Sequence, residues 1–306
     1  MGAVEVVEYT DPWCSWAWGT EPKLRRLRWR WGDRLQWRTV MGDLVADRKA
    51  GDPSFDPVAA APRTAGHWQH VHEHTAMPWP VGLRWAPASS AVAARAVKAC
   101  QLQGDVVARA LLRALRESCF VYSAPADSKP RILDLAETVP GTDVRRLAAD
   151  IDSDEVATTF WADRDETRRP NAYVVSLRET HEGKGNAKPD GDGWRYVFPT
   201  LLFRGPGGEH TVPGWQPWER YPAAMEAAAA ESLGPGRPDP EPEEAFATWP
   251  LLTERELSFL CGEGARPPAG VVSVGWGAGT AFARPDAPRA SPAGEGRLTA
   301  RTAGGP

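Results

Sequence analysis

Cys14 is the residue best suited to covalent chemistry. It lies in the stretch Thr10–Trp18 (TDPWCSWAW), between an expected strand and an expected helix. A thiol at the N-terminus of a helix meets the positive end of the helix dipole and amide donors without helical partners. Both favour the thiolate, which is the nucleophilic form. The pattern therefore predicts a nucleophile with a lowered pKa. The competing interpretation is a core residue, because free cysteine packs as a small hydrophobe.

A proline inside a strand pattern is the second feature. Pro199 follows Phe198 and precedes Thr200 within the run Tyr196–Arg204 (YVFPTLLFR). Proline has no backbone N–H for a sheet ladder, so a position within a strand needs a reason, and a cis bond before the proline would supply one. The competing interpretation is an edge strand that begins at Pro199.

Three further cysteines, Cys100, Cys119 and Cys261, are widely spaced along the chain. They form no recognisable disulfide framework, which fits a reducing compartment. Cys100 lies on the apolar side of an expected helix. For Cys100 and Cys119, core packing is favoured over a role in redox chemistry. Cys261 lies in a variable tail and is given no role.

Four histidines cluster at His67, His70, His72 and His74. In a helix the first, second and fourth would share one face, a spacing that could bind zinc. The same helix needs Trp68 and Val71 to face the core, which leaves these histidines toward solvent. We therefore expect no metal site.

The elements around Cys14 follow a β-α-β order. Val4–Tyr9 is valine-rich and short, which predicts a strand. Leu24, Leu27 and Trp31 recur at helical spacing, and Leu35–Met41 alternates as a second strand, parallel to the first. This order predicts a right-handed crossover unit.

Helices are expected from about residue 57 to residue 169. The expected helix starts are Ser89 or Ser90, Asp105, Asp127 or Ser128, Thr142, and Ser153. β-structure is expected to return with strands at Ala172–Leu177, Trp194–Arg204 and Glu209–Val212, before a last helix over residues 217–231. The whole predicts an α/β thioredoxin fold with a large all-helical insertion. A short Pro/Gly-rich extension follows at the C-terminus.

The expected domain boundaries follow from this order. Residues 1–50 form the first half of a thioredoxin-like domain, residues 51–170 the helical insertion, and residues 171–232 the second half. Residues 233–306 are expected to form a linker, a small module and a disordered tail of about 20 residues.

The sequence resembles the cytoplasmic bacterial branch of the DsbA-type thiol oxidoreductases, a branch that includes ClpXP adaptors of the SpxH kind. The matching segments lie within residues 3–230: TDPWCSWAWGTEPKLRRL (Thr10–Leu27), VMGDLV (Val40–Val45), HTAMPW (His74–Trp79), SSAVAARAVKACQLQG (Ser89–Gly104), LLRALRESCFVY (Leu111–Tyr122) and FPTLLF (Phe198–Phe203). The resemblance implies a thioredoxin fold, Cys14 as the attacking thiol and Pro199 as a cis-proline. It also implies that the backbone before Pro199 pairs with an extended peptide substrate.

The sequence departs from this family at Ala17. Redox-active members have Cys-x-x-Cys, and here alanine takes the place of the second cysteine. Disulfide exchange passes through a mixed disulfide, which a second thiol normally resolves. Ala17 cannot do so, which leaves an external thiol, another cysteine of the chain, or no turnover at all.

The first functional hypothesis is a DsbA-like monothiol–disulfide oxidoreductase that acts through Cys14 on protein or glutathione-type mixed disulfides. No cofactor is expected to be bound, and a low-molecular-weight thiol such as glutathione would be the cosubstrate. The expected substrate-binding residues are Trp13, Ser15, Trp16, Phe198, Pro199 and Thr200. The tryptophans could instead be core residues.

Two alternatives remain. The first is a redox-inactive adaptor that presents a client protein to a protease, which the loss of the second cysteine fits. The second is a kappa-type glutathione transferase or isomerase, in which the helix N-terminus activates bound glutathione. That group carries a serine near this position, so Cys14 argues mildly against it.

The bulk composition narrows the choice of partners. The chain has 36 basic and 40 acidic residues and a net charge of −4, with the two signs interspersed. This balance favours neither nucleic acid nor an anionic membrane as a partner. No apolar run approaches the roughly 20 residues of a membrane span, and no signal peptide is recognisable at the N-terminus. We therefore expect a cytoplasmic protein.

Overall fold

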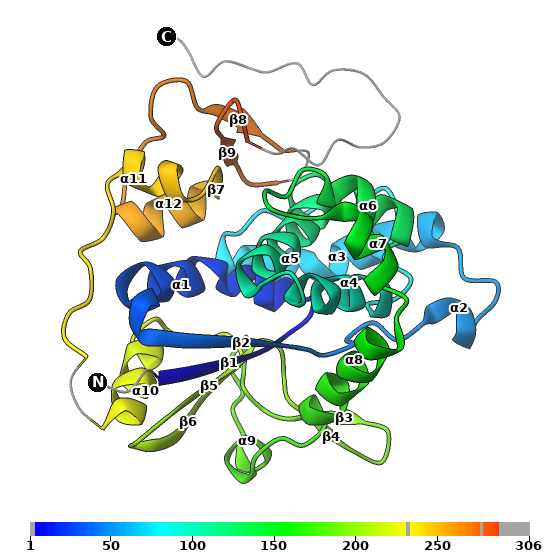
Figure 1. The fold of residues 1–306 in the computed structure, drawn as a ribbon, viewed down its shortest axis with the longest axis horizontal. Helices are drawn as coiled ribbons and strands as arrows, with labels where there is room; N and C mark the ends of the chain where they lie inside the picture. The colour runs from blue at the N-terminus through cyan, green and yellow to red at the C-terminus, as the bar shows by residue number, and fades with distance from the viewer. Residues whose placement is uncertain (1–3, 231–232, 276–277, 288–306) are drawn as a thin grey trace. The chain divides into compact units, whose positions relative to one another are not determined.

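The N-terminal β-α-β unit forms as predicted. Strand β1 (Val4–Thr10), helix α1 (Ser15–Trp31) and strand β2 (Leu35–Met41) follow one another in the computed structural model (Figure 1). β1 and β2 are parallel, in a register that runs from Val4 opposite Leu35 to Thr10 opposite Met41. The structure describes residues 4–230, 233–275 and 278–287.

Two compact units make up the described chain. The first comprises the described residues of Met1–Gly42 and Trp161–Asp239, and the second those of Asp43–Phe160 and Pro240–Pro306. The two thioredoxin-like halves of the sequence thus meet in one unit.

The first unit is built on a four-stranded sheet with strand order β2-β1-β5-β6. Strand β5 (Thr200–Gly205) pairs antiparallel with β1, so the expectation that these distant segments share a sheet is confirmed. Strand β6 (Gly208–Pro213) follows β5 through a tight hairpin. Gly208 turns this hairpin with a φ of +100°, a conformation that glycine adopts without the steric cost of a Cβ.

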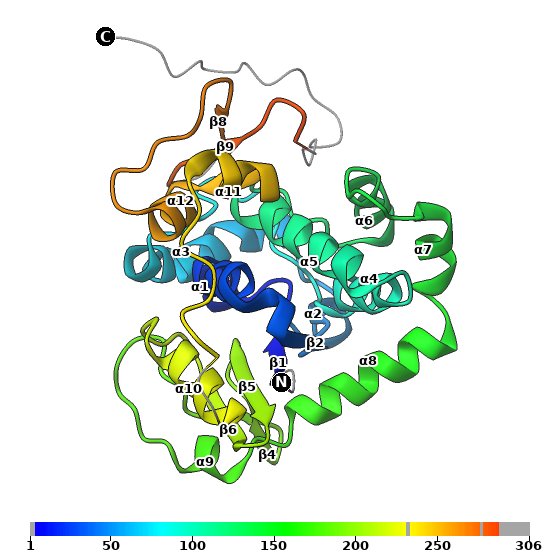
Figure 2. The same cartoon turned by 60° about the vertical axis from the view of Figure 1, so that its left-hand side comes forward.

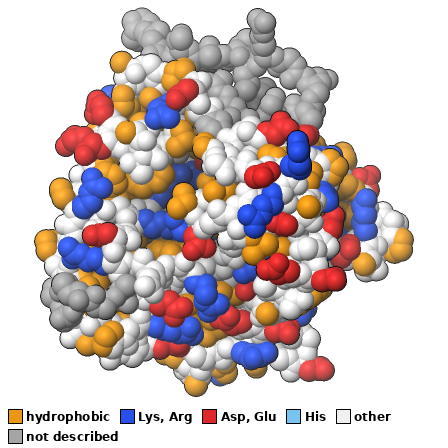
Figure 3. Space-filling view, viewed as in Figure 1, with side chains coloured by type: hydrophobic (Ala, Val, Ile, Leu, Met, Phe, Trp, Pro, Cys, Tyr) orange, Lys and Arg blue, Asp and Glu red, His pale blue; other side chains and the backbone are white. Residues whose placement is uncertain are grey.

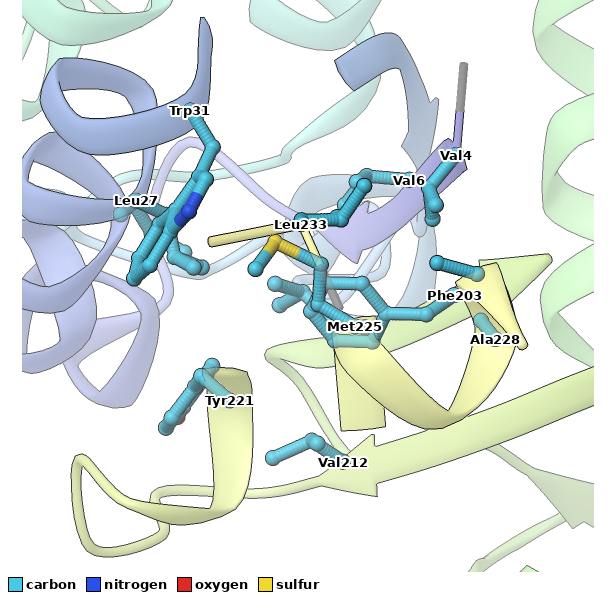
Figure 4. Close-up of a cluster of buried hydrophobic side chains, with 13 residues drawn as sticks. Val4, Val6, Leu27, Trp31, Phe203, Val212, Tyr221, Met225, Ala228 and Leu233 are labelled. Atoms are coloured by element: carbon cyan, nitrogen blue, oxygen red, sulfur yellow. The ribbon is translucent and has the colours of Figure 1, made fainter. Parts of the chain in front are cut away.

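Helices α1 and α10 (Arg220–Ala229) pack on one face of this sheet (Figure 2). The strands supply inward-facing residues, and the two helices supply aliphatic and aromatic side chains between them (Figure 4). The cluster consists of Val4, Val6, Leu24, Leu27, Trp31, Leu201, Phe203, Val212, Tyr221, Met225, Ala228, Ala229 and Leu233. This core fixes the position of α1, and therefore of the residue at its N-terminus.

The last turns of helix α8 (Asp154–Thr167), from Trp161 onward, contact β1 and β2 in the same unit. The Tyr9 hydroxyl donates a 2.8 Å hydrogen bond to Glu166, and Arg38 donates two more to the same carboxylate at 2.9 and 2.6 Å. Asp163 accepts a hydrogen bond from the backbone N–H of Met41 at 3.0 Å. These polar contacts attach α8 to β1 and β2, the strands before and after helix α1.

Residues 233–239 lie along α1 although their composition is that of a linker. The side chain of Asp239 pairs with Arg26 and Arg30. The indole N–H of Trp29 donates to the carbonyl of Pro238 at 2.7 Å, and that of Trp31 to the carbonyl of Gly234 at 3.1 Å. This segment is therefore a bound part of the first unit rather than a free connector.

Two strand predictions in the second half are wrong. Helix α9 (Ala172–Ser176) takes the place of the strand expected at Ala172–Leu177, because the Asn171 side chain accepts a hydrogen bond from the backbone N–H of Val174 and caps a helical turn. The run Trp194–Arg204 is divided. Strand β4 (Gly193–Arg195) pairs with β3 (Lys188–Asp190) in a separate two-stranded sheet, and β5 begins only at Thr200.

The second unit is mostly helical, as predicted. Its helices are α2 (Arg48–Gly51), α3 (Pro57–Thr75), α4 (Ala91–Gln101), α5 (Asp105–Phe120), α6 (Lys129–Ala136), α7 (Val144–Asp150), α11 (Pro242–Thr248) and α12 (Glu254–Cys261). Ser90 and Ser128 are the N-cap residues of α4 and α6, and α5 begins at Asp105. On α3, Trp68 and Val71 are buried, and His67, His70 and His74 are exposed.

The C-terminal part of the second unit forms a small module of helices and strands between residues 242 and 283. Strands β7 (Leu251–Thr253), β9 (Ala281–Ala283) and β8 (Val272–Val274) form a three-stranded sheet. The buried residues Ala245, Phe246, Leu252, Leu257 and Leu260 form a core cluster. Arg113 of α5 binds the fully buried carboxylate of Glu256 through two hydrogen bonds at 2.8 and 3.0 Å. The predicted disordered tail falls on residues 288–306, which lie outside the described residues.

Candidate active site

Cys14 is the N-cap residue of α1, where its backbone is extended (φ −82°, ψ 109°). Its Sγ accepts a 3.4 Å hydrogen bond from the backbone N–H of Ala17, an amide that has no partner within the helix. A turn that starts at Asp11 leads into this position, since the Asp11 carboxylate accepts from the N–H of Trp13 at 2.9 Å. Residue Cys14 is only 4% exposed. Helix dipole and amide donor therefore act on a shielded sulfur.

The proline loop reaches the same sulfur. The Phe198–Pro199 peptide bond is cis, and the carbonyl oxygen of Phe198 accepts a 3.4 Å hydrogen bond from the thiol of Cys14. The carbonyl of Pro199 accepts a 2.8 Å hydrogen bond from the N–H of Gly214, which joins the loop to the end of β6. Two motifs 184 residues apart in sequence thus meet at one thiol.

The aromatic ring of Phe198 is held by two neighbours. It lies against Gly42, where a Cβ would stand 2.1 Å from the ring. In addition, the guanidinium carbon of Arg195 lies 5.1 Å from the ring centroid. The Gly42 carbonyl in turn accepts a hydrogen bond from Arg168. Gly42 is therefore required where Phe198 approaches the backbone.

Arg195 is a residue that the sequence did not reveal as part of the site. Burial lowers the pKa of its guanidinium, and the negative charge of the Cys14 thiolate acts in the opposite direction. By the same electrostatic attraction, Arg195 favours the thiolate of Cys14. In the sequence, Arg195 could be noticed only as a basic residue three positions before Phe198. It was not singled out, because the run Trp194–Arg204 was interpreted as one strand.

The other residues expected to bind substrate differ in exposure. Trp13, Ser15 and Thr200 are buried, and the Thr200 hydroxyl donates to the carbonyl of Val197 at 2.6 Å. Trp16 is partly exposed, and its ring centroid lies 6.5 Å from that of Trp215. Of these four side chains, only Trp16 offers a partly open surface next to Cys14.

The buried cysteines of the second unit are poor nucleophiles. Burial raises the pKa of Cys100 to about 12, with a smaller contribution from Asp150. Burial also raises the pKa of Cys119 well above its ordinary value, with Asp127 adding to the effect. Both thiols therefore stay protonated at neutral pH, and core packing explains their presence.

The contact between Gly42 and Phe198 leads to a testable prediction. We expect Gly42→Ala to lower the free energy of unfolding by about 1–3 kcal/mol, because the new methyl group overlaps the Phe198 ring. It should also slow reactions of Cys14, because the carbonyl of Phe198 moves with its ring. Chemical denaturation and the rate of thiol modification measure the two effects.

The control variants are Phe198→Ala and Gly66→Ala. In a Phe198→Ala background the ring is gone, so Gly42→Ala should cost much less than in the wild type. Gly66 lies in α3, and a methyl group added there would have no neighbouring atom within 4 Å, so Gly66→Ala should be neutral or stabilising. An equal cost of Gly42→Ala with and without the Phe198 ring would show that the contact is not the cause.

The class of protein follows from this fold and from comparison with a family model. Residues 8–169, more than half of the chain, match the model of a family described as thioredoxin. The chain belongs to this thioredoxin family. Within the described residues, no helix is both long enough and apolar enough to cross a bilayer.

Two solved structures share the fold. One is a putative protein disulfide isomerase from Nitrosomonas europaea, with a TM-score of 0.54 and 17% identity over 73% of this chain and 96% of that one. The other is the cytosolic disulfide reductase DsbM from Pseudomonas aeruginosa, with a TM-score of 0.50 and 17% identity over 73% of this chain and 93% of that one. The predicted α/β thioredoxin fold with a helical insertion is thereby confirmed.

The curated proteins that are similar in sequence are named as adapters of a protease rather than as oxidoreductases. The chain is 24% identical over 174 residues to the ClpXP adapter protein SpxH of Halalkalibacterium halodurans, a match that spans 56% of each chain. It is 24% identical over 246 residues to the protein of the same name in Bacillus subtilis, covering 75% of this chain and 79% of that one. The chain thus spans about half the length of the first of these relatives.

Proposed function

We propose that the chain is a monothiol–disulfide oxidoreductase whose nucleophile is Cys14. The observation that carries the proposal is the position of Sγ, which receives the N–H of Ala17 and lies 3.4 Å from the carbonyl of Phe198. The amide donor at the N-cap and the nearby guanidinium favour the thiolate, whereas the hydrogen bond from the thiol to the Phe198 carbonyl favours the protonated form.

The reaction has two exchange steps. The Cys14 thiolate attacks one sulfur of a substrate disulfide, so that a new S–S bond forms, the old one breaks, and the leaving thiolate takes up a proton. An external thiol then loses its proton and attacks the substrate sulfur of the mixed disulfide. A disulfide between the external thiol and the substrate sulfur forms, the bond to Cys14 breaks, and the Cys14 thiolate is released. Glutathione, or another low-molecular-weight thiol, supplies the second step because Ala17 cannot. Such a cycle suits a reducing compartment, and we propose a cytoplasmic location.

The substrate would enter along the proline loop. Trp16 is partly exposed beside Cys14, and the backbone of Phe198 and Pro199 borders the sulfur. An extended peptide could lie against this backbone as an added strand. We propose that Trp13, Ser15 and Thr200 support this surface from their buried positions.

The proposal is tested by trapping the intermediate. Wild-type protein mixed with glutathione disulfide should form a mixed disulfide at Cys14, visible by intact mass, that persists until more thiol is added. The Cys14 thiolate, followed by its ultraviolet absorbance, should titrate below the value of about 8.5 for free cysteine. Cys14→Ser is the control for both signals. A titration midpoint at or above that of free cysteine, with no adduct, would reject the enzymatic function.

A second candidate is a redox-inactive adaptor that presents a client protein to a ClpXP-type protease. It is favoured by the names of the curated relatives and by the alanine at position 17. In this function the surface around Phe198, Pro199 and Trp16 would bind a client without covalent chemistry. Cys14 would then be dispensable.

A further inference from the structure

Two cations lie side by side next to the Cys14 site. Lys188 of β3 and Arg195 of β4 are direct partners in the antiparallel pair, so their side chains project on the same face. Like charges directly opposite each other destabilise a strand pair. The arrangement therefore carries a cost that a negatively charged partner would offset.

The contacts of Arg195 place this pair close to the sulfur. Its guanidinium lies over the ring of Phe198, and the carbonyl of the same Phe198 lies 3.4 Å from Sγ of Cys14. One guanidinium nitrogen donates a 3.0 Å hydrogen bond to the carbonyl of Tyr196. The remaining N–H groups still offer the planar fork that binds carboxylates.

The negative charges of Asp190 and Asp11 act on Arg195, but both carboxylates also bind other groups. Asp190 binds Arg168 at 2.6 Å, and Asp11 accepts from the backbone of Trp13. Within the described residues, neither Lys188 nor Arg195 forms an ion pair. Burial lowers the pKa of Lys188, and the positive charges of Lys184 and Arg195 lower it further. Figure 3 shows Lys and Arg side chains among Asp and Glu side chains on one face of the molecule.

We infer that Lys188 and Arg195 form a carboxylate-binding subsite, which selects disulfides that carry a carboxylate near the reacting sulfur. The inference rests on the proposed function of Cys14. The carboxylate could belong to a small thiol compound or to an acidic protein segment. Arg195 is the specificity-determining residue, because it connects the cation pair to the Phe198 loop.

The test compares disulfides that differ in charge. Rates of mixed-disulfide formation at Cys14 are measured with glutathione disulfide, with neutral bis(2-hydroxyethyl) disulfide and with cationic cystamine. Each rate is corrected for the thiolate fraction of the variant. We expect Arg195→Gln to lower the ratio of the glutathione disulfide rate to the neutral disulfide rate about tenfold, and to raise the ratio of the cystamine rate to the neutral disulfide rate. Lys188→Gln should act in the same direction with a smaller effect, and added salt should weaken the wild-type preference.

Arg220→Gln is the matched control, since Arg220 is an exposed arginine on α10 that contacts Tyr173. Acidic and neutral peptide disulfides distinguish the two sources of the carboxylate. If only glutathione disulfide reacts faster than the neutral disulfide, the carboxylate belongs to a small thiol compound. If the acidic peptide disulfide also reacts faster than the neutral peptide disulfide, the carboxylate belongs to a protein segment. Equal slowing of all disulfides by Arg195→Gln would overturn the subsite while leaving the monothiol function intact. Absence of any reaction at Cys14 would instead reject the proposed function.

Discussion

Ala17→Cys is expected to convert the protein into a dithiol reductase. Ala17 lies one helical turn beyond Cys14, and its N–H already contacts Sγ at 3.4 Å. A sulfur at position 17 would attack the mixed disulfide within the same molecule, which replaces a slow bimolecular step. With dithiothreitol as reductant, insulin reduction should rise at least about tenfold above that of the wild type. Because Ala17 is fully buried, the extra atom should cost about 1–3 kcal/mol of stability.

Ala17→Ser is the matched control for this gain. Serine is close to cysteine in size but cannot form a disulfide, so it reproduces the packing change without the chemistry. If Ala17→Cys reduces insulin no faster than Ala17→Ser, the loop is not a working thiol–disulfide site.

Loss of Cys14 should have the second large effect. We expect Cys14→Ser to reduce thiol–disulfide exchange to the uncatalysed rate, because burial keeps Cys100 and Cys119 protonated. The fold should survive, since serine is a favourable N-cap residue and can accept the same N–H of Ala17. Exchange with a glutathionylated peptide measures the first effect, and thermal unfolding measures the second.

The same variant separates the enzyme from the adaptor. Cys261→Ser serves as its control and should retain full exchange, because Cys261 is given no role in the site. In a degradation assay with a ClpXP-type protease and a bound client, the adaptor function predicts that Cys14→Ser behaves as the wild type. Unchanged cellular function of Cys14→Ser, with no exchange activity in the wild type, would leave only the docking role.

The sequence predicted the part of the fold that depends on local pattern. The valines of β1, the spacing of Leu24, Leu27 and Trp31, and the alternation in β2 are each readable within a few residues. Cys14 at the start of α1 was predicted from the same pattern. The helical block was equally readable, because caps such as Ser128 precede apolar residues at helical spacing.

Features that depend on distant contacts were not predictable. The run Ala172–Ser176 is rich in β-favouring residues, yet the Asn171 cap makes it helical. β4 ends at Arg195, because Tyr196 donates its N–H to the carbonyl of Thr167 instead of a strand partner, and β5 begins only after Pro199. The sequence analysis treated β4 and β5 as one strand that included Arg195. The contact between the Arg195 guanidinium and the Phe198 ring was therefore not predicted. The requirement for glycine at position 42 likewise becomes visible only when the Phe198 ring is in place.

The binding of residues 233–239 along α1 determines where the protein can be shortened. Composition suggests cutting near residue 232, where the Pro/Gly-rich stretch begins. Such a truncation would expose Trp29 and Trp31 to solvent, although in the full chain they are only 8% and 3% exposed. It would also remove the carbonyls that accept hydrogen bonds from their indole N–H groups. It would also leave Arg26 and Arg30 without Asp239. A shortened form of the protein that keeps the first unit must therefore retain Asp239. A chain that ends earlier would expose the indole rings of Trp29 and Trp31 to solvent and would tend to aggregate.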